Sequence, residues 1–361
     1  MLRIAKDCAA KGHDVTIYTG QWRGDKPDNI EVVLLPSKGL LNHQRHRSLI
    51  HAMQQALLQK PVDYVLGFNR MSGLDTYYAA DPCFIERAHQ ERGWWYRLTG
   101  RYRFFAQSEA AVFGSKQPCK ILLLAPTEKG VFQRWYQTQD NRFYQLPPSI
   151  PQQKFEGLDR VSARNKLRQE FGLPTHAKVV LLVGSAFHRK GLDRAILALA
   201  ALPENIRANT WLIAVGEDEA KPMQLIAASS HVEKHLIMAA ARHDVPELML
   251  GSDILVHPAR SELAGLVIIE AMTAGLPVIV TENCGYATHI AQSSGGVVLP
   301  SPYQQMAMDK ALQDLLTETN LDSIGQRGEH YVKHIANSNS ATTEADWIEQ
   351  FAQEKLAGQA R

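Results

Sequence analysis

The stretch from Asp253 to Val280 constrains the fold more than any other part of the sequence. Two short apolar runs, typical of buried parallel strands, enclose a segment from Gly265 to Thr273 whose apolar residues recur at helical spacing. Gly275 follows the segment where a helix would end. A strand–helix–strand unit of this kind predicts an α/β fold with a parallel sheet.

Two acidic residues flank the start of the predicted helix. Glu262 lies in the loop before it, and Glu270 follows after seven intervening residues. Between them, Ala264-Gly265-Leu266 leaves the backbone accessible, and a helix N-terminus is an anion site suited to phosphate. Phosphate flanked by hydroxyl acceptors describes a nucleotide sugar. The alternative is one solvated acid and one capping acid, and the spacing alone does not decide between the two.

A length of 361 residues predicts more than one domain. The proline-rich segment 147–153 is the clearest linker, so we expect domains at 1–151 and 152–335, followed by a helical tail at 336–361. No apolar run approaches the length of a membrane span, and residues 1–15 lack the apolar core of a signal peptide. The cysteines are scattered, which favours a cytoplasmic chain with reduced thiols.

The second half of the chain places cations after a predicted strand. Residues 178–183 form an apolar run that is followed by Gly184 and Ser185 and then by Arg189 and Lys190. Residues just past strand ends lie where α/β folds bind ligands, and both cations bind phosphate well. The alternative is a pair of solvated cations, which a following helix N-terminus would disfavour.

The first half of the chain is basic and carries an unusual aromatic segment. Residues 1–150 hold 20 Lys and Arg against 13 Asp and Glu, whereas the remainder holds 19 against 24. The segment from Phe84 to Phe113 interleaves arginines with tryptophan, tyrosine and phenylalanine. This composition favours an anionic membrane surface. Stacking on single-stranded nucleic acid and plain core packing are the alternatives, but the sequence contains no other nucleic-acid module.

The first half also offers a carboxylate just past a predicted strand. Asp81 follows the strand candidate 77–80, so it lies where a substrate group is expected, although a helix cap is the commoner role of such an Asp. The chain opens with a helical pattern from Leu2 to Ala9 and only then with a strand. We therefore expect the first domain to lack the strand and loop with which parallel α/β domains usually begin.

Several motifs occur together in one order: Gly184-Ser185, Arg189-Lys190-Gly191, Gly216, Arg242-His243-Asp244-Val245, and Glu262 with Glu270. In this combination the chain resembles the retaining GT-B glycosyltransferases. Five further segments resemble lipopolysaccharide core glucosyltransferases within that family: residues 66–75, 77–81, 97–103, 146–150 and 282–291. The resemblance extends over nearly the whole chain.

The resemblance implies two Rossmann-like, doubly wound parallel-sheet domains that face each other across a cleft. It also implies transfer of glucose from UDP-glucose, with retention, to a heptose of the lipopolysaccharide inner core. The reaction would take place at the inner face of the cytoplasmic membrane, with neither a metal nor another cofactor. The anionic membrane would be contacted through Phe84 to Phe113, and no nucleic acid is expected as a partner.

The resemblance also implies residue roles. Glu270 would accept hydrogen bonds from the ribose hydroxyls, and Glu262 would accept hydrogen bonds from hydroxyls of the transferred sugar. Arg189 and Lys190 would neutralise the charge of the leaving diphosphate. The remaining positions implied are Gly184 and Ser185 in the nucleotide-sugar site, backbone N–H groups of Ala264, Gly265 and Leu266, Arg242 to Val245 beside the uracil, and Asp81 at the acceptor hydroxyl.

One departure from the family leaves a second hypothesis open. The family begins with a strand and a Gly-rich loop ahead of the first helix, so about 20 residues are expected to be missing here, with a miscalled start codon as the simplest cause. The alternative function is a catalytically impaired remnant that binds a nucleotide sugar or a membrane. A sugar-nucleotide epimerase is not supported, because no GxGxxG motif follows a first strand and no Tyr-x-x-x-Lys occurs.

Overall fold

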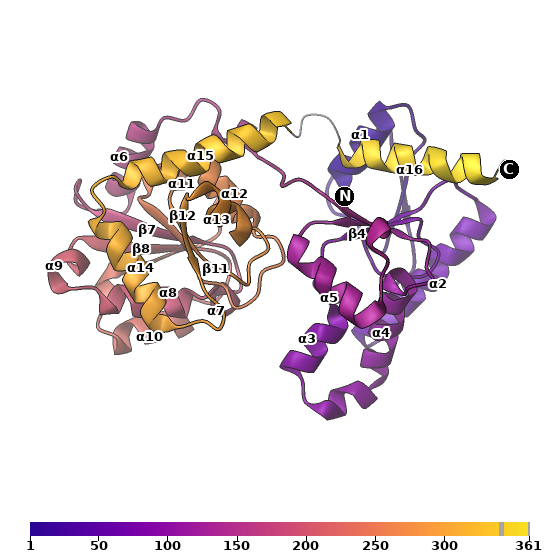
Figure 1. Cartoon of the computed structure of the whole chain (residues 1–361), viewed down its shortest axis with the longest axis horizontal. Coiled ribbons are helices and arrows are strands. Elements are labelled where there is room, and N and C mark those ends of the chain that lie inside the picture. Colours follow the sequence, from indigo (N-terminus) through magenta and orange to yellow (C-terminus); the bar gives the residue numbers. More distant parts are fainter. Residues whose placement is uncertain (339–342, 360–361) are drawn as a thin grey trace. The chain divides into compact units, whose positions relative to one another are not determined.

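The structure is a computed structural model that describes residues 1–338 and 343–359. The chain forms two compact units, one from Met1–Leu146 together with the C-terminal helix α16 (Glu344–Gln359), and one from Pro147–Asn339 (Figure 1). The first boundary lies within a few residues of the one expected at 151. The boundary expected at 335 falls inside helix α15 (Leu321–Ser338), so residues 336–338 continue the second unit.

The second unit is built on a six-stranded parallel sheet in the order β12-β11-β10-β7-β8-β9. Its strands are β7 (Lys178–Val183), β8 (Thr210–Val215), β9 (Leu236–Ala239), β10 (Ile254–His257), β11 (Val278–Thr281) and β12 (Gly296–Leu299). The chain winds from β7 towards β9, returns to β10 and then winds the other way. This is the doubly wound Rossmann order, in which ligands bind beyond the carboxyl ends of the strands at the reversal point, here between β7 and β10.

Helices cover both faces of this sheet (Figure 1). They are α6 (Arg160–Glu170), α7 (Phe187–Lys190), α8 (Leu192–Ala201), α9 (Glu204–Arg207), α10 (Lys221–Ser229), α11 (Val245–Gly251), α12 (Leu266–Thr273), α13 (Ala287–Ser293), α14 (Gln305–Thr317) and α15, with 3-10 turns η3 (Gln152–Phe155) and η4 (Glu233–His235). Alternate residues of β7 point to opposite faces, so Val180 and Leu182 join the core under α8 and α14, while Val179 and Leu181 join the core under α12 and α13.

The first unit is also an α/β unit with parallel strands, which form two sheets, β1-β2 and β3-β4-β5-β6. Its strands are β1 (Thr16–Thr19), β2 (Glu31–Leu34), β3 (Leu66–Gly67), β4 (Thr76–Ala79), β5 (Lys120–Leu123) and β6 (Phe143–Gln145). Its other elements are α1 (Leu2–Ala10), α2 (Asn42–Gln59), α3 (Phe84–Glu91), η1 (Trp94–Leu98), α4 (Gly100–Phe113), α5 (Pro126–Tyr136) and η2 (Asp140–Arg142). As the sequence indicates, a helix precedes the first strand.

The C-terminal helix α16 belongs to the first unit because it packs on the sheet of that unit. Phe351 of α16 is buried against Leu122 and Leu146, and its ring centroid lies 4.5 Å from that of Tyr144. Lys355 adds an ion pair with Asp75 at 2.9 Å. No helix among residues 1–338 and 343–359 is long and apolar enough to cross a membrane.

A buried ionic contact ties helix α6 to the sheet of the second unit. Asp253 accepts hydrogen bonds from Arg168 at 2.9 Å and from the backbone N–H of Val179 at 2.8 Å. The Arg168 guanidinium also donates to the carbonyl of Gly251 at 2.8 Å, and Asp253 and Arg168 are only 7% and 3% exposed. The two side chains therefore pair with each other and also form hydrogen bonds with backbone groups at the start of β7 and just before β10.

We predict that Asp253→Ala destabilises the second unit by about 3–5 kcal/mol, because Arg168 would be left as a buried charge without its carboxylate. Urea unfolding followed by far-UV circular dichroism measures this loss. The matched control is Asp314→Ala, which removes an exposed partner of Lys310 on α14 and should change the stability by less than about 0.5 kcal/mol. Equal losses of unfolding free energy in the two variants would show that the buried pair contributes no more to stability than an exposed pair does.

Candidate active site

The loops that follow β7 and β10 meet at the reversal point of the sheet. Gly191 ends the first loop with φ of +80°, and a Cβ there would lie 2.1 Å from the carbonyl oxygen of Pro258 in the second. Gly184 has φ of +130°, and a Cβ there would lie 3.1 Å from the Cε atom of Lys190. Only glycine allows the approach at position 191, and the positive φ at both positions favours glycine. The two glycines therefore let the loops touch and let the Lys190 side chain pass across the end of β7.

Three of the predicted catalytic residues come together at this contact. Glu262, in the loop after β10, accepts a hydrogen bond at Oε2 from Arg189 Nη1 at 3.0 Å and a second one from Lys190 Nζ. Both cations belong to the short helix α7 rather than to an open loop. The structure thus places two cations and a carboxylate at the point where a doubly wound sheet binds its ligand. Lys190 is buried and the Glu262 side chain is only 16% exposed, so these two groups are not solvated, whereas the Arg189 side chain is 46% exposed.

The electrostatics of this cluster keep Glu262 ionised. Burial raises the pKa of Glu262, but the neighbouring His257 and Lys190 outweigh burial and lower it to about 2. The pKa of His257 is lowered by its complete burial, although Glu262 acts in the opposite direction. At neutral pH Glu262 is therefore a carboxylate and lies beside a neutral imidazole.

The helix after Glu262 begins with an open N-terminus. Gly265 is the N-cap residue of α12, with φ of +85°, and no side chain of the described residues caps the helix. The loop before it is held by two backbone hydrogen bonds, from Gly285 to the Glu262 carbonyl at 3.1 Å and from Tyr286 to the Ala264 carbonyl at 2.9 Å. The loop carrying the predicted backbone donors Ala264, Gly265 and Leu266 is thus fixed beside the cations, as an anion site requires.

The other predicted residues of the second unit belong to the loops and helices that follow β7, β9 and β10. Glu270 of α12 pairs with Lys154 of η3 at 2.7 Å. Ser185, after β7, accepts at its hydroxyl from the backbone N–H of Glu217 at 3.1 Å. Arg242 follows β9 and is held by Asp244 at 2.6 Å and by Glu170 of α6, while Val245 begins α11. The structure contains no ligand, so their predicted contacts with nucleotide and ribose stay predictions.

Asp81 lies in the first unit, just after β4. Its side chain is exposed, and its backbone carbonyl accepts from Arg70 Nη2 at 2.7 Å. The alternative role as a helix cap is not observed, since the N-cap residue of α3 is Cys83. Instead, the buried carboxylate of Glu109 accepts from the backbone N–H groups of Phe84 at 2.8 Å and Ile85 at 3.1 Å.

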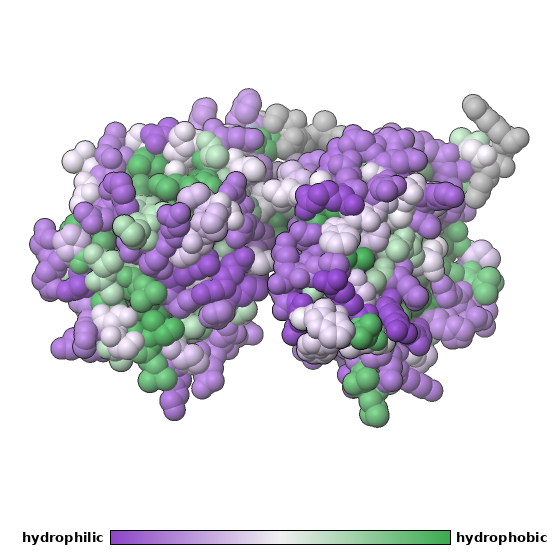
Figure 2. Space-filling view, turned by 60° about the horizontal axis from the view of Figure 1, so that its bottom comes forward, coloured by the Kyte–Doolittle hydropathy of each residue, from purple (hydrophilic) through white to green (hydrophobic). Residues whose placement is uncertain are grey.

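The arginine- and aromatic-rich segment divides into a packed part and an exposed part. Phe84 and Phe104 pack against Phe105 of α4, at ring-centroid distances of 5.4 and 5.2 Å. In η1, by contrast, Trp94, Trp95 and Leu98 are 72%, 60% and 62% exposed. Figure 2 turns the lower side of Figure 1 towards the viewer and shows hydrophilic and apolar side chains interspersed on this side of the unit. Core packing therefore accounts for the phenylalanines of α3 and α4 but not for the tryptophans of η1.

Two site residues are not among those predicted. His257 is the last residue of β10, and its Nε2 atom lies 3.8 Å from Glu262 Oε2. The rule that residues at the carboxyl ends of strands face ligands could have identified it. Lys154, the partner of Glu270, lies beyond the proline-rich linker, and nothing in its local sequence connects it with α12. Among the described residues, no three His, Cys, Asp or Glu side chains gather as they would around a metal ion.

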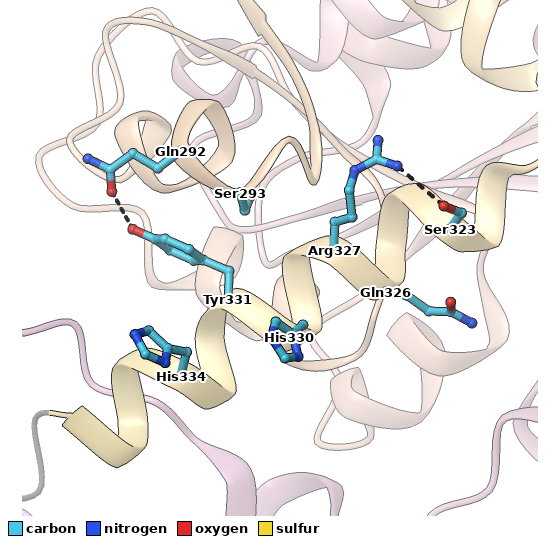
Figure 3. A pocket seen from close by; sticks show the side chains of 8 residues that line it. All are labelled: Gln292, Ser293, Ser323, Gln326, Arg327, His330, Tyr331 and His334. Atoms are coloured by element: carbon cyan, nitrogen blue, oxygen red, sulfur yellow. Dashed lines mark hydrogen bonds between the residues drawn. The ribbon is translucent and has the colours of Figure 1, made fainter.

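A hollow of about 590 Å³ lies elsewhere on the second unit (Figure 3). It is lined by Gln292, Ser293, Ser323, Gln326, Arg327, His330, Tyr331 and His334. Figure 3 shows Tyr331 hydrogen-bonded to Gln292 across it. Helix α13 starts near the carboxyl edge of the sheet and contributes its last residues to the hollow, so the hollow lies away from the loops after β7 and β10. None of the predicted site residues lines it.

Comparison with known proteins agrees with this geometry. The family Glycosyl transferases group 1 matches residues 163–330. The lipopolysaccharide glucosyltransferase WaaG of Escherichia coli (strain K12) is 42% identical over 320 residues, which cover 89% of this chain and 86% of that protein. A crystal structure of WaaG, a glycosyltransferase involved in lipopolysaccharide biosynthesis, matches with a TM-score of 0.85 and 39% identity over 97% of this chain and 93% of that one.

A more distant structure, sucrose-phosphate synthase from Thermosynechococcus elongatus, shares only the fold, with a TM-score of 0.73 and 18% identity over 99% of this chain and 92% of that one. Fold and site together define a glycosyltransferase of the GT-B class. Within that class, the chain belongs to the family of the lipopolysaccharide glucosyltransferase WaaG.

Proposed function

We propose that this protein transfers glucose from UDP-glucose, with retention of configuration, to a heptose of the lipopolysaccharide inner core. The observation that carries the proposal is the contact of Arg189 and Lys190 with Glu262 beside the open N-terminus of α12. Family membership supports the reaction class, and the name of the relative supports glucose and lipopolysaccharide.

The geometry accounts for the chemistry of the donor. A diphosphate at this edge of the sheet would meet the backbone N–H groups at the start of α12 and the two cations of α7. As the bond to the sugar breaks, negative charge develops on the diphosphate, and fixed cations stabilise that charge more than they stabilise the bound donor. We propose that Arg189 and Lys190 meet this requirement without a metal ion.

The two acids would then divide the rest of the donor between them. Glu262 lies beside the cations and is proposed to accept from hydroxyls of the transferred sugar. Glu270 lies on α12 and is proposed to accept from the ribose, for which Lys154 would give up part of its contact. Arg242 to Val245 are proposed to border the uracil, and Asp81 to orient the acceptor hydroxyl.

The proposed acceptor is part of a lipid, so we further propose that the protein works on the inner face of the cytoplasmic membrane. The exposed side chains of η1 and the exposed Arg97, Arg101 and Arg103 support this part of the proposal. Tryptophan favours the headgroup region of a bilayer, and arginine attracts anionic lipid.

A remnant that binds UDP-glucose but does not transfer glucose is the competing hypothesis. Incubation of the purified chain with radiolabelled UDP-glucose and lipopolysaccharide that lacks core glucose decides between the two. Label in the lipopolysaccharide supports the enzyme, and donor binding without transfer supports the remnant. The assay run in the presence of EDTA tests whether a metal is needed.

Lys190→Ala is expected to lower kcat by about 10²–10³ while the Kd for UDP changes much less, because the charge matters most as the bond breaks. Turnover and UDP calorimetry measure the two effects side by side. Lys310→Ala removes an exposed lysine of α14 and should change neither. Normal turnover in the Lys190 variant would remove this residue from the mechanism, and a proportional loss of UDP affinity would make it a binding residue only.

The two glutamates should differ in which part of the donor they bind. Glu270→Ala should weaken UDP itself, since its proposed partner is the ribose. Glu262→Ala should leave UDP affinity nearly unchanged and weaken only UDP-glucose, by about tenfold or more for the loss of charged hydrogen bonds. Calorimetry with both ligands measures this difference. If both variants bind UDP equally poorly, the division of roles is wrong.

The membrane proposal predicts sedimentation with vesicles that contain anionic lipid, weak binding to neutral vesicles and partial release by salt. Replacing Arg97, Arg101 and Arg103 together with Ser should abolish most binding, since each Arg contributes about 1 kcal/mol near an anionic surface. These side chains are exposed, so the fold should persist.

The control for the triple arginine variant removes the same charge from the second unit, by replacing Lys234, Lys310 and Lys333 with Ser. Trp94→Ser with Trp95→Ser tests the apolar contribution, which salt should not affect. Equal binding to neutral and anionic vesicles would remove the electrostatic explanation. A folded protein that binds neither would show that η1 has no membrane role.

A further inference from the structure

His257 is a buried polar residue whose hydrogen-bonding capacity is unused. It is 0% exposed, and neither of its ring nitrogens has a hydrogen-bond partner among the described residues. A buried polar group without a partner destabilises a fold, and such exceptions in native proteins call for a reason. A leucine at this position would fill the core without that penalty.

The unused imidazole faces the candidate active site. Its Nε2 atom lies 3.8 Å from Glu262 Oε2, which is too long for a hydrogen bond. The same oxygen already accepts from Lys190 and Arg189. The charged and titratable groups that act on His257 are Glu262, Lys190 and Arg189, and burial keeps its ring neutral by lowering its pKa. Because an ionised carboxylate repels a nitrogen lone pair, the neutral ring is expected to carry its proton on Nε2.

Binding of the donor changes which groups can donate hydrogen bonds to Glu262. Under the proposed function, Lys190 and Arg189 turn to the diphosphate, so the carboxylate loses donors that now hold it. With UDP alone, water in the place of the sugar can replace those donors, whereas bound UDP-glucose fills that place. The Glu262 side chain is only 16% exposed, and a buried carboxylate without partners is unfavourable. A shift of roughly 1 Å would bring His257 Nε2 to hydrogen-bonding distance from Glu262.

We propose that His257 is a positioning residue that holds Glu262 when the donor occupies the site. Its Nε2–H donates to Glu262 Oε2, which leaves Oε1 free to accept from a hydroxyl of the transferred sugar. The inference rests on the proposed function, because it assigns to Glu262 the sugar rather than the nucleotide. His257 touches neither the phosphate nor the sugar, so it acts only through Glu262.

Two substitutions separate positioning from packing. His257→Leu introduces an apolar side chain of similar length that has no hydrogen-bond donor. His257→Gln retains an N–H group near the position of Nε2. The matched control is His289→Leu on α13, because His289 is half-buried and already contacts the Tyr331 hydroxyl at 3.0 Å through Nδ1.

We expect His257→Leu to bind UDP within about twofold of the wild type and to bind UDP-glucose about 10- to 100-fold more weakly, since a hydrogen bond to a charged group is lost. His257→Gln should recover most of this affinity, and His289→Leu should leave the ratio of the two affinities unchanged. Calorimetry with UDP and UDP-glucose measures that ratio. A His257→Leu variant that binds UDP-glucose normally, or that loses both ligands in step with no recovery by Gln, overturns the proposal.

A spectroscopic readout covers the case in which His257→Leu does not fold. In protein labelled with ¹⁵N-histidine, the His257 signals are assigned by comparison with His257→Gln. Nε2 should be protonated in the free protein, and its proton should move to lower field on addition of UDP-glucose but not of UDP. An Nε2 signal that does not respond to UDP-glucose overturns the proposal. If Glu262→Ala fails to distinguish the two ligands, it is the proposed function of Glu262 that fails.

Discussion

The contact between the loops after β7 and β10 is the constraint on which the candidate site depends. In a doubly wound sheet these two strands are neighbours although about 70 residues separate them in the chain, so their carboxyl ends open side by side. Gly191 against the carbonyl of Pro258 sets how closely the loops approach. This approach lets Arg189 and Lys190, from one loop, share the carboxylate of Glu262 from the other. A bulkier residue at position 191 would separate the loops and with them the charges.

The cluster is built from charged groups that hold one another in place. His257 and Lys190 lower the pKa of Glu262 despite its burial, and Glu262 in turn holds Lys190 and Arg189 at the edge of the sheet. Such an arrangement suits a site that receives a diphosphate, because both cations are already placed, and Lys190 is already buried, before the ligand arrives. When the cations turn to the diphosphate, Glu262 loses their hydrogen bonds, and His257 is proposed to replace them.

In the first unit, buried charged residues hold the start of α3, whereas the tryptophans of η1 are exposed. Glu109 is fully buried and fixes the start of α3 through backbone N–H groups, while Arg70 pairs with the same carboxylate at 2.7 Å. The 3-10 turn η1 follows α3 in the chain, and its tryptophans are exposed to solvent. The composition of the segment alone does not distinguish rings that pack on α4 from rings that are exposed, because both occur within the same run of aromatic residues.

The sequence by itself determined the α/β class, the parallel strands of the second unit and the motifs that flank them, because apolar periodicity and glycine positions are local properties of the chain. It also brought out Arg189, Lys190 and Glu262 as candidates, since each follows a recognisable strand. Only the tertiary structure decided that these three share one oxygen atom, that Lys154 pairs with Glu270, and that His257 lies buried behind Glu262. The first two contacts join segments far apart in the chain, and His257 is close to Glu262 in sequence but is buried by the packing of the sheet. All of these distances follow from strand order and loop packing rather than from local sequence.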